Sequence, residues 1–396
     1  DSALRATIRV SGDSAVRRVA RLALTATLQY AGNWSALAGL AGVPVDASAA
    51  APSYAARADS GGDSTRHDPA ATDAVPPTAG TDPTTMKASV EAWARAFRRV
   101  PAARFDFPRA PVTLELTRSE TGVPMIPVLI NGHPYRFWLD TGSSLTILSS
   151  AVAVAAGVTP LVTDSLEAVT ATGRVAALPA LVERLELGAL RIEHNSAMIV
   201  SAEELVLSRG DSASRVYVDG IIGFDAIRHM DLELDYPAGR ATIRRPAPPD
   251  SAAERDRNLF WLGYPVVRLS AADGTPVHFG LDTGADESYA AIPLLVKTQA
   301  RTYLGERKDV GGFGKALKVQ GRFIPRLRLL VRDTPVRLER VFVFVTQSPT
   351  LFSLDGMLGG DVGAGGVVRI DMTNGVFAVR RSAGRGAKSG AETASR

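Results

Sequence analysis

The chain contains 396 residues, of which 45% are apolar and 22% are charged, so it has the composition of a globular protein and the length of two or three domains. It has no cysteine, which excludes disulfides, thiol nucleophiles and cysteine-ligated metals, and its five histidines form no i, i+4 pair, so no metal or other cofactor is expected. The 45 basic and 41 acidic residues leave a net charge of +4, too small to indicate nucleic-acid binding, and no apolar run is long enough to span a membrane.

The N-terminal quarter of the chain is predicted to be helical, with a linker inside it. Residues 1–45 combine helix formers with apolar residues at helical spacing, interrupted at Gly32, and predict a helical segment. Residues 46–85 are mostly small, polar or proline, and they predict a flexible linker because they cannot bury enough apolar surface to offset the entropy of ordering. The amphipathic pattern over 84–99 indicates another helix, so residues 86–107 are expected to lead as a helix into the next unit.

From 108 to 382 the pattern is that of an all-β region. Short runs alternate apolar and polar residues and are separated by Gly, Pro, Asn and Asp. In one such run Asp231, Glu233 and Asp235 lie at every second position, which predicts the solvent-facing side of a strand rather than a metal site. The small, polar tail over 383–396 is predicted to be disordered.

The β region contains an internal repeat. The segment Gly132–Gly142 recurs as Gly274–Gly284, with Gly, Pro, Phe, Leu, Asp, Thr and Gly matching in place at an offset of 142 residues. A second block, Asp219–Asp225, recurs as Asp355–Asp361 at an offset of 136 residues. Each Asp-Thr-Gly triplet therefore follows an apolar strand and precedes an Asp-Gly-apolar-apolar-Gly block. A single triplet is a weak signal, but two in the same setting indicate a duplicated structural unit.

These motifs resemble the active-site loops of the aspartic proteases. The segment Phe137–Ser144 is similar to the first loop of pepsin-like enzymes, and Gly280–Asp286 is similar to the loop of the retroviral enzymes. The resemblance, to a bacterial two-lobed retropepsin-like protease, implies a mainly β fold. It implies two similar retropepsin-like β-barrel lobes in a pepsin-like bilobal arrangement, over 108–250 and 251–382, with a small α-helical N-terminal extension.

The resemblance assigns catalysis to Asp140 and Asp282, one from each lobe. Two carboxyl groups about 3 Å apart cannot both ionise, so they share one proton, as aspartic-protease dyads are known to do. The ionised member can take a proton from a water molecule, while the protonated member polarises the peptide carbonyl. The expected activity is therefore that of an aspartic endopeptidase that hydrolyses peptide bonds of an extended polypeptide.

Two further sets of residues follow from the resemblance. Support of the active-site loops is assigned to Thr141, Gly142, Ser143, Thr283, Gly284 and Ala285. The threonine hydroxyls are implied to bond across the lobe interface, and the Ser143 hydroxyl could bond the neighbouring carboxylate. Substrate-binding flaps are assigned to Thr170, Ala171, Thr172 and Gly173 in the first lobe and to Gly311, Gly312, Phe313 and Gly314 in the second.

Other interpretations stay open at this stage. The fold could serve as a catalytically silent peptide-binding module. Residues 1–107 could also act as an inhibitory pro-segment whose arginines approach the two acids, namely Arg5, Arg17, Arg18 and Arg21. The expected partner is a peptide or unfolded protein segment, and the catalytic unit is expected to be monomeric. The composition suggests a bacterial protein. We expect a periplasmic or secreted location, with a signal peptide removed before Asp1 and the cytoplasm as the alternative, and a less acidic pH optimum than that of pepsin.

Overall fold

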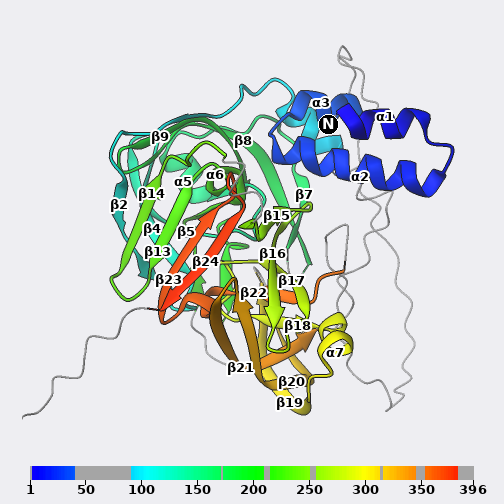
Figure 1. The fold of residues 1–396 in the computed structure, drawn as a ribbon. Coiled ribbons are helices and arrows are strands. Elements are labelled where there is room, and N and C mark those ends of the chain that lie inside the picture. Colours follow the sequence, from blue (N-terminus) through cyan, green and yellow to red (C-terminus); the bar gives the residue numbers. More distant parts are fainter. Residues whose placement is uncertain are drawn as a thin grey trace, which may run out of the picture.

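The computed structural model describes residues 2–40, 91–170, 173–208, 215–249, 256–312, 315–344 and 353–381. These residues form two β lobes joined by a common sheet, with helices packed at one side, as Figure 1 shows. The prediction of a mainly β fold is confirmed. The predicted linker at 46–85 and tail at 383–396 lie outside the described residues. No helix within the described ranges is long and apolar enough to cross a membrane.

The N-terminal segment forms a group of helices that docks on the first lobe. They are α1 (Ser2–Val10), α2 (Ser14–Tyr30) and α3 (Trp34–Leu40), followed by helical backbone at 91–97. The chain turns between α2 and α3 at Gly32, where φ is 63° and glycine is favoured. Leu24 and Leu28 are four residues apart on one face of α2 and are fully buried against Phe97 and Leu145. Since Leu145 belongs to the first lobe, this apolar cluster fixes the helices to it.

The first lobe is a nine-stranded sheet that closes on itself. Its strands are β1 (Arg104–Asp106), β3 (Thr117–Arg118), β4 (Pro124–Ile130), β5 (His133–Leu139), β6 (Thr146–Ser149), β7 (Leu166–Thr170), β8 (Gly173–Leu187), β9 (Leu190–Val200) and β12 (Gly220–Ile222). A separate ribbon, β10 (Val206–Ser208) with β11 (Arg215–Tyr217), and helices α5 (Ser150–Ala155) and α6 (Phe224–Ile227) complete it. The sheet runs β1-β9-β6-β12-β5-β4-β8-β7, and pairing of β8 with β9 closes it around the apolar core.

The second lobe repeats this plan with eight strands. They are β15 (Leu259–Trp261), β16 (Pro265–Ala271), β17 (Pro276–Leu281), β18 (Tyr289–Ala291), β19 (Tyr303–Gly312), β20 (Lys315–Val331), β21 (Thr334–Phe344) and β22 (Gly356–Leu358), with α7 (Ile292–Thr298) and the 3-10 turn η2 (Gly360–Gly363). Pairing of β16 with β20 closes this sheet. In each lobe the Asp-Gly-apolar-apolar-Gly block supplies a strand, β12 or β22, that runs parallel to β5 or β17.

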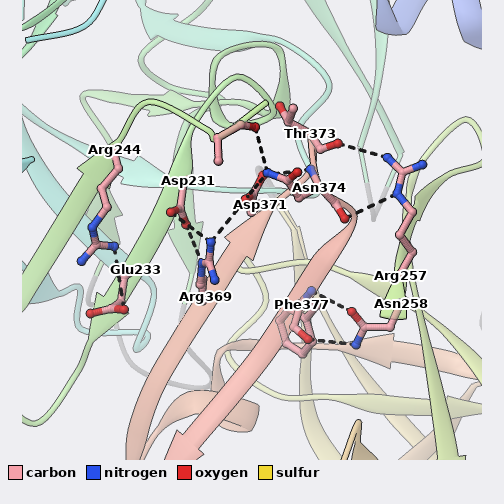
Figure 2. A network of polar contacts seen from close by, with 11 residues as sticks. Asp231, Glu233, Arg244, Arg257, Asn258, Arg369, Asp371, Thr373, Asn374 and Phe377 are labelled. Atoms are coloured by element: carbon pink, nitrogen blue, oxygen red, sulfur yellow. Dashed lines mark hydrogen bonds and ion pairs between the residues drawn. The ribbon is translucent and has the colours of Figure 1, made fainter. Parts of the chain in front are cut away.

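A third sheet joins the lobes, in the order β2 (Val112–Glu115), β14 (Arg240–Arg244), β13 (Asp231–Asp235), β23 (Gly366–Asp371) and β24 (Val376–Arg381). At the seam, Arg369 on β23 donates from Nε and Nη2 to the two carboxylate oxygens of Asp231 on β13, at 2.7 and 3.1 Å. Figure 2 shows this pair beside Asn258, whose side chain exchanges two hydrogen bonds with the backbone of Phe377. These contacts tie the two lobes together through one continuous sheet.

The carboxylates at 231, 233 and 235 correct one prediction. The sequence predicts that they face solvent, but Asp231 is only 7% exposed and pairs with Arg369 of the neighbouring strand β23. Glu233 and Asp235 are half-buried and pair with arginines as well, Glu233 with Arg380 and Asp235 with Arg240. A period-two pattern identifies one face of a strand, but it does not show which side chains of other strands pair with the residues on that face.

Candidate active site

Each Asp-Thr-Gly triplet begins where a central strand of its lobe ends. Strand β5 ends at Leu139 and β17 ends at Leu281, and the next residue in each case is the aspartate. The backbone N–H of Asp140 donates to the Ile222 carbonyl of β12 at 3.1 Å, and that of Asp282 donates to the Leu358 carbonyl of β22 at 2.9 Å. The duplicated strands β12 and β22 therefore lie beside the two loops and fix the start of each.

The structure brings the side chains of Asp140 and Asp282 together, and we call this pair the dyad. One oxygen of Asp140 accepts hydrogen bonds from the backbone N–H groups of Gly142 and Ser143, at 2.7 and 3.2 Å. Asp282 accepts from Gly284 and Ala285 in the same way, at 3.0 and 3.1 Å. The two carboxyl groups lie close together across the two loops, since the carboxyl group of Asp140 fills the space beside Gly284 and that of Asp282 fills the space beside Gly142. Neighbouring buried carboxyl groups oppose each other's ionisation, so they share one proton.

Thr141 and Thr283 lock the two loops together. The Thr141 hydroxyl donates to the Leu281 carbonyl at 2.8 Å and accepts from the Thr283 backbone N–H at 3.0 Å. The Thr283 hydroxyl donates to Leu139 at 2.7 Å and accepts from the Thr141 backbone N–H at 3.0 Å. Both threonines are buried. The four reciprocal hydrogen bonds fix the distance between the lobes at the dyad.

The surroundings of the dyad favour one protonated and one ionised acid. Burial of both carboxyl groups raises their pKa values, because the charged form loses hydration. The negative charge of Asp140 raises the pKa of Asp282 further, while the backbone N–H groups and Asp282 itself lower the pKa of Asp140. The pair therefore keeps one shared proton at pH values at which an isolated aspartate would be ionised.

Comparison with known proteins identifies the family of the first lobe. Residues 126–229 match the profile of a family described as "gag-polyprotein putative aspartyl protease". This lobe belongs to the retropepsin-like aspartic protease family. The match covers β4 through α6, and so includes the loop of Asp140 but not the second lobe.

Two solved structures are similar to the chain at low identity. A retropepsin-like aspartic protease from Rickettsia conorii has 16% identity and a TM-score of 0.24, over 36% of this chain and 92% of that one. An aspartic proteinase from Irpex lacteus has 13% identity and a TM-score of 0.39, over 69% of this chain and 98% of that one. No curated protein sequence matches the chain.

Both predicted flaps fall at the tips of β-hairpins. Thr170 pairs with Gly173 where β7 turns into β8, and Gly312 pairs with Lys315 where β19 turns into β20, next to Gly311. The other four predicted flap residues, Ala171, Thr172, Phe313 and Gly314, lie outside the described residues.

Some predicted contacts of the candidate site are replaced by others. The Ser143 hydroxyl donates to the Leu145 carbonyl at 2.7 Å instead of to Asp140, which receives only the backbone N–H of Ser143. Arg17 and Arg21 donate to the Ser11 and Leu40 carbonyls, so their guanidinium groups bind within the helical segment. The described residues contain no group of three or more His, Asp or Glu side chains placed to hold a metal ion.

The structure adds one residue that the sequence did not indicate, Tyr264. Its hydroxyl lies beside Asp282, since a Cβ atom on Gly142 would be 2.7 Å from the hydroxyl oxygen and 2.6 Å from Oδ1 of Asp282. Tyr264 directly precedes Pro265, the first residue of β16. In the first lobe Val123 precedes Pro124, the first residue of β4, in the same way. An aromatic residue in only one copy of the repeat was the signal that could have identified Tyr264.

The glycines at the dyad leave no room for a side chain. A Cβ atom on Gly284 would lie 2.4 Å from Cγ of Asp140, and one on Gly142 would lie 2.6 Å from Cγ of Asp282. We expect Gly284→Ala to lower kcat by about a hundredfold or more, because an ångström-scale displacement of a reacting group costs that much. Steady-state kinetics on a fluorogenic peptide would measure this change.

The matched control for this substitution is Gly274→Ala, at a turn of the same lobe where no atom lies within 4 Å of the added Cβ. Its positive φ of 86° should cost stability but not activity. Equal losses of kcat in the two folded variants would show that the close contact at Gly284 does not matter.

Asp225 supports the turn below the first loop, and its counterpart Asp361 does so in the second lobe. Asp225 accepts hydrogen bonds from the Thr146 hydroxyl at 3.2 Å and from the Asn195 amide at 3.1 Å. Asp361 accepts from both the backbone N–H and the hydroxyl of Ser288. These acids hold the turn after β12 and after β22, so their role is structural.

Burial raises the pKa of Asp225 from 3.8 to about 6, despite the nearby Arg228. The pKa of Asp225 is higher in the folded protein than in the unfolded chain, so protonation of Asp225 stabilises the fold. This contribution to the free energy of unfolding is complete below about pH 4 and is lost as the pH rises through about 6. The free energy of unfolding then falls by about 3 kcal/mol. Asp225→Asn should remove this part of the pH dependence. Urea unfolding at pH 4, 5, 6 and 7 would test it, and an unchanged difference between wild type and variant across these pH values would contradict it.

Proposed function

We propose that the protein is an aspartic endopeptidase whose catalytic residues are Asp140 and Asp282. The observation that carries this proposal is the pairing of two half-buried aspartates, one from each copy of the repeat, held by matching backbone hydrogen bonds. Both acids come from one chain, so we also propose that a single chain forms the complete site. The family of the first lobe supports a peptide substrate.

In the proposed mechanism one acid of the dyad starts ionised and the other protonated, and we assign the ionised role to Asp140 and the protonated role to Asp282. Ionised Asp140 takes a proton from a water molecule as the water oxygen attacks the carbonyl carbon, and Asp282 gives its proton to the carbonyl oxygen. The product of this step is a tetrahedral diol. Asp140 then passes its proton to the amide nitrogen while Asp282 recovers one from a diol hydroxyl, and the C–N bond breaks. Protons balance, and the dyad returns to its starting state.

The backbone around the dyad prepares it for this cycle. The N–H groups of Gly142 and Ser143 point at Asp140 before substrate arrives, so its negative charge needs no reorganisation to be stabilised. The β7–β8 and β19–β20 hairpins offer strand edges to which an extended peptide could add by backbone hydrogen bonds. The substrate class that fits is therefore an extended polypeptide segment.

One observation favours the second candidate, a peptide-binding module without turnover. The Tyr264 hydroxyl contacts Asp282, so one side of the dyad is already occupied by a protein group. Such a contact could hold the dyad in an unproductive state. The two candidates differ in whether peptide bonds are broken.

The test is digestion of a proteome-derived peptide library from pH 3 to pH 8, with and without pepstatin, read by mass spectrometry. We expect internal cleavage that pepstatin abolishes, with an optimum less acidic than that of pepsin. Binding of peptides without cleavage at any pH would instead support the second candidate. Cleavage that is insensitive to pepstatin and peaks near pH 2 would contradict both the mechanism and the expected optimum.

A further inference from the structure

Tyr264 reaches the dyad across the backbone of the second lobe. A Cβ atom on Gly280 would lie 3.1 Å from Cε1 of the Tyr264 ring, so the ring lies on this part of β17. A Cβ on Gly142 would lie 2.7 Å from the Tyr264 hydroxyl oxygen and 2.6 Å from Oδ1 of Asp282. The hydroxyl is therefore next to both the loop of the first lobe and the acid of the second.

The two copies of the repeat differ here at two positions together. The first lobe has Trp138 where the second has Gly280, two residues before the aspartate in both cases. The first lobe also has Val123 where the second has Tyr264, directly before the proline that begins a strand. A Cβ atom at position 280 would lie 2.3 Å from Sδ of Met357 and 3.1 Å from the Tyr264 ring, so the missing side chain leaves room for both. The second lobe thus accommodates an aromatic side chain beside the strand that ends at its aspartate.

The turn that carries Tyr264 is clamped by the N-terminal helices. The indole Nε1 of Trp261 donates to the Ala26 carbonyl of α2 at 2.9 Å, and its ring stacks on Phe224 of α6 with 5.3 Å between centroids. Tyr30, at the end of α2, covers the same indole at 5.1 Å. Within the turn, the Leu262 N–H donates to the Tyr264 carbonyl at 3.0 Å. Contacts from both α2 and the first lobe therefore fix the position of the turn from which the Tyr264 side chain extends.

We propose that Tyr264 is a positioning residue of the dyad, and that its hydroxyl donates a hydrogen bond to Asp282 when that carboxyl group is ionised. This inference rests on the proposed function. The titratable groups that face the hydroxyl are Asp282 and Asp140, from the two loops, and Tyr289 on β18. None of them is a cation that could replace the hydroxyl as a donor.

The charges around the Tyr264 hydroxyl determine in which direction it shifts the ionisation of the dyad. Burial and the negative charges of Asp282 and Asp140 raise the pKa of Tyr264 well above its ordinary value, so the hydroxyl keeps its proton. A permanent donor favours the ionised form of the carboxyl group that it contacts. Tyr264 therefore lowers the pH at which the dyad loses its last proton, and so sets the basic limit of activity.

The test is the pH dependence of kcat and kcat/KM for Tyr264→Phe. We expect the basic limb to move up by about half to one pH unit, the usual size of a shift caused by one hydrogen bond, with kcat lower by about tenfold and KM little changed. Site-specific replacement of Tyr264 by 3,5-difluorotyrosine, a stronger donor of nearly the same size, should move the limb to lower pH. The matched control is Tyr236→Phe, another buried tyrosine, whose ring is covered by Arg118 and which should leave both limbs in place.

A readout without turnover separates this inference from the proposed function. Carbon-13 NMR of labelled aspartate carboxyl groups, with the Asp282 signal assigned by its loss in Asp282→Asn, follows the same ionisation in an inactive protein. If the wild type cleaves no peptide, the proposed function fails, and the NMR shift still decides the role of Tyr264. Unmoved titration curves in folded Tyr264→Phe and in the difluorotyrosine protein would overturn the proposal.

Discussion

Asp140→Asn is expected to reduce kcat/KM for peptide hydrolysis by about three to four orders of magnitude. Asparagine cannot ionise, so the variant lacks the base that takes a proton from water. The amide has nearly the shape of the carboxyl group, and its oxygen can still accept from the Gly142 and Ser143 backbone N–H groups. The fold should therefore persist, and the loss should appear in kcat with KM nearly unchanged.

The two acids of the dyad act as one unit, so the effects of substituting them should not multiply. Asp282→Asn should cost about as much as Asp140→Asn, and the double variant should cost no more than either single one. Asp219→Asn is the control, because this acid belongs to the repeated block of the first lobe but is exposed. Losses that multiply in the double variant would indicate two independent roles, and a folded Asp140→Asn that cleaves at the wild-type rate would refute the mechanism.

The parts of the site that could be predicted were those encoded by the repeat. Asp140 and Asp282 stand at the same place in two copies of one unit, so the prediction that the two lobes face each other also predicts that these acids meet. The same holds for Thr141 and Thr283, whose reciprocal hydrogen bonds follow from an approximate twofold relation between the loops. A duplication thus carries long-range information that local patterns lack.

The features that could not be predicted depend on contacts between segments far apart in the chain. Whether Asp231 faces solvent depends on β23, 138 residues away at Arg369, and no local pattern reports that pairing. The docking of α2 on Trp261 joins positions 235 residues apart through a backbone carbonyl, which has no side-chain signature. Tyr264 was missed for the same reason, because its role requires the absence of a side chain at Gly280 and the placement of the turn by α2.

Thr283→Val is expected to lower the free energy of unfolding by about 2–5 kcal/mol, since removing one partner leaves buried groups without hydrogen bonds. Valine has nearly the same shape as threonine, but it cannot donate to the Leu139 carbonyl or accept from the Thr141 N–H. Both of these groups belong to the other lobe, so the loss falls on the contact that sets the distance between the two acids. We expect kcat to fall by at least about tenfold as well, since the geometry of the dyad loosens.

Two matched variants separate this lock from an ordinary loss of a hydroxyl. Thr283→Ser keeps the hydroxyl and should keep most of the stability and activity. Thr298→Val removes a hydroxyl that donates to the Leu294 carbonyl within α7, where no contact between lobes is involved, and should cost little. Chemical unfolding and peptide kinetics measured on all three would decide the matter. If Thr283→Val and Thr298→Val lose the same stability and neither loses activity, the threonines do not hold the lobes in register, because only the first of the two hydroxyls crosses between them.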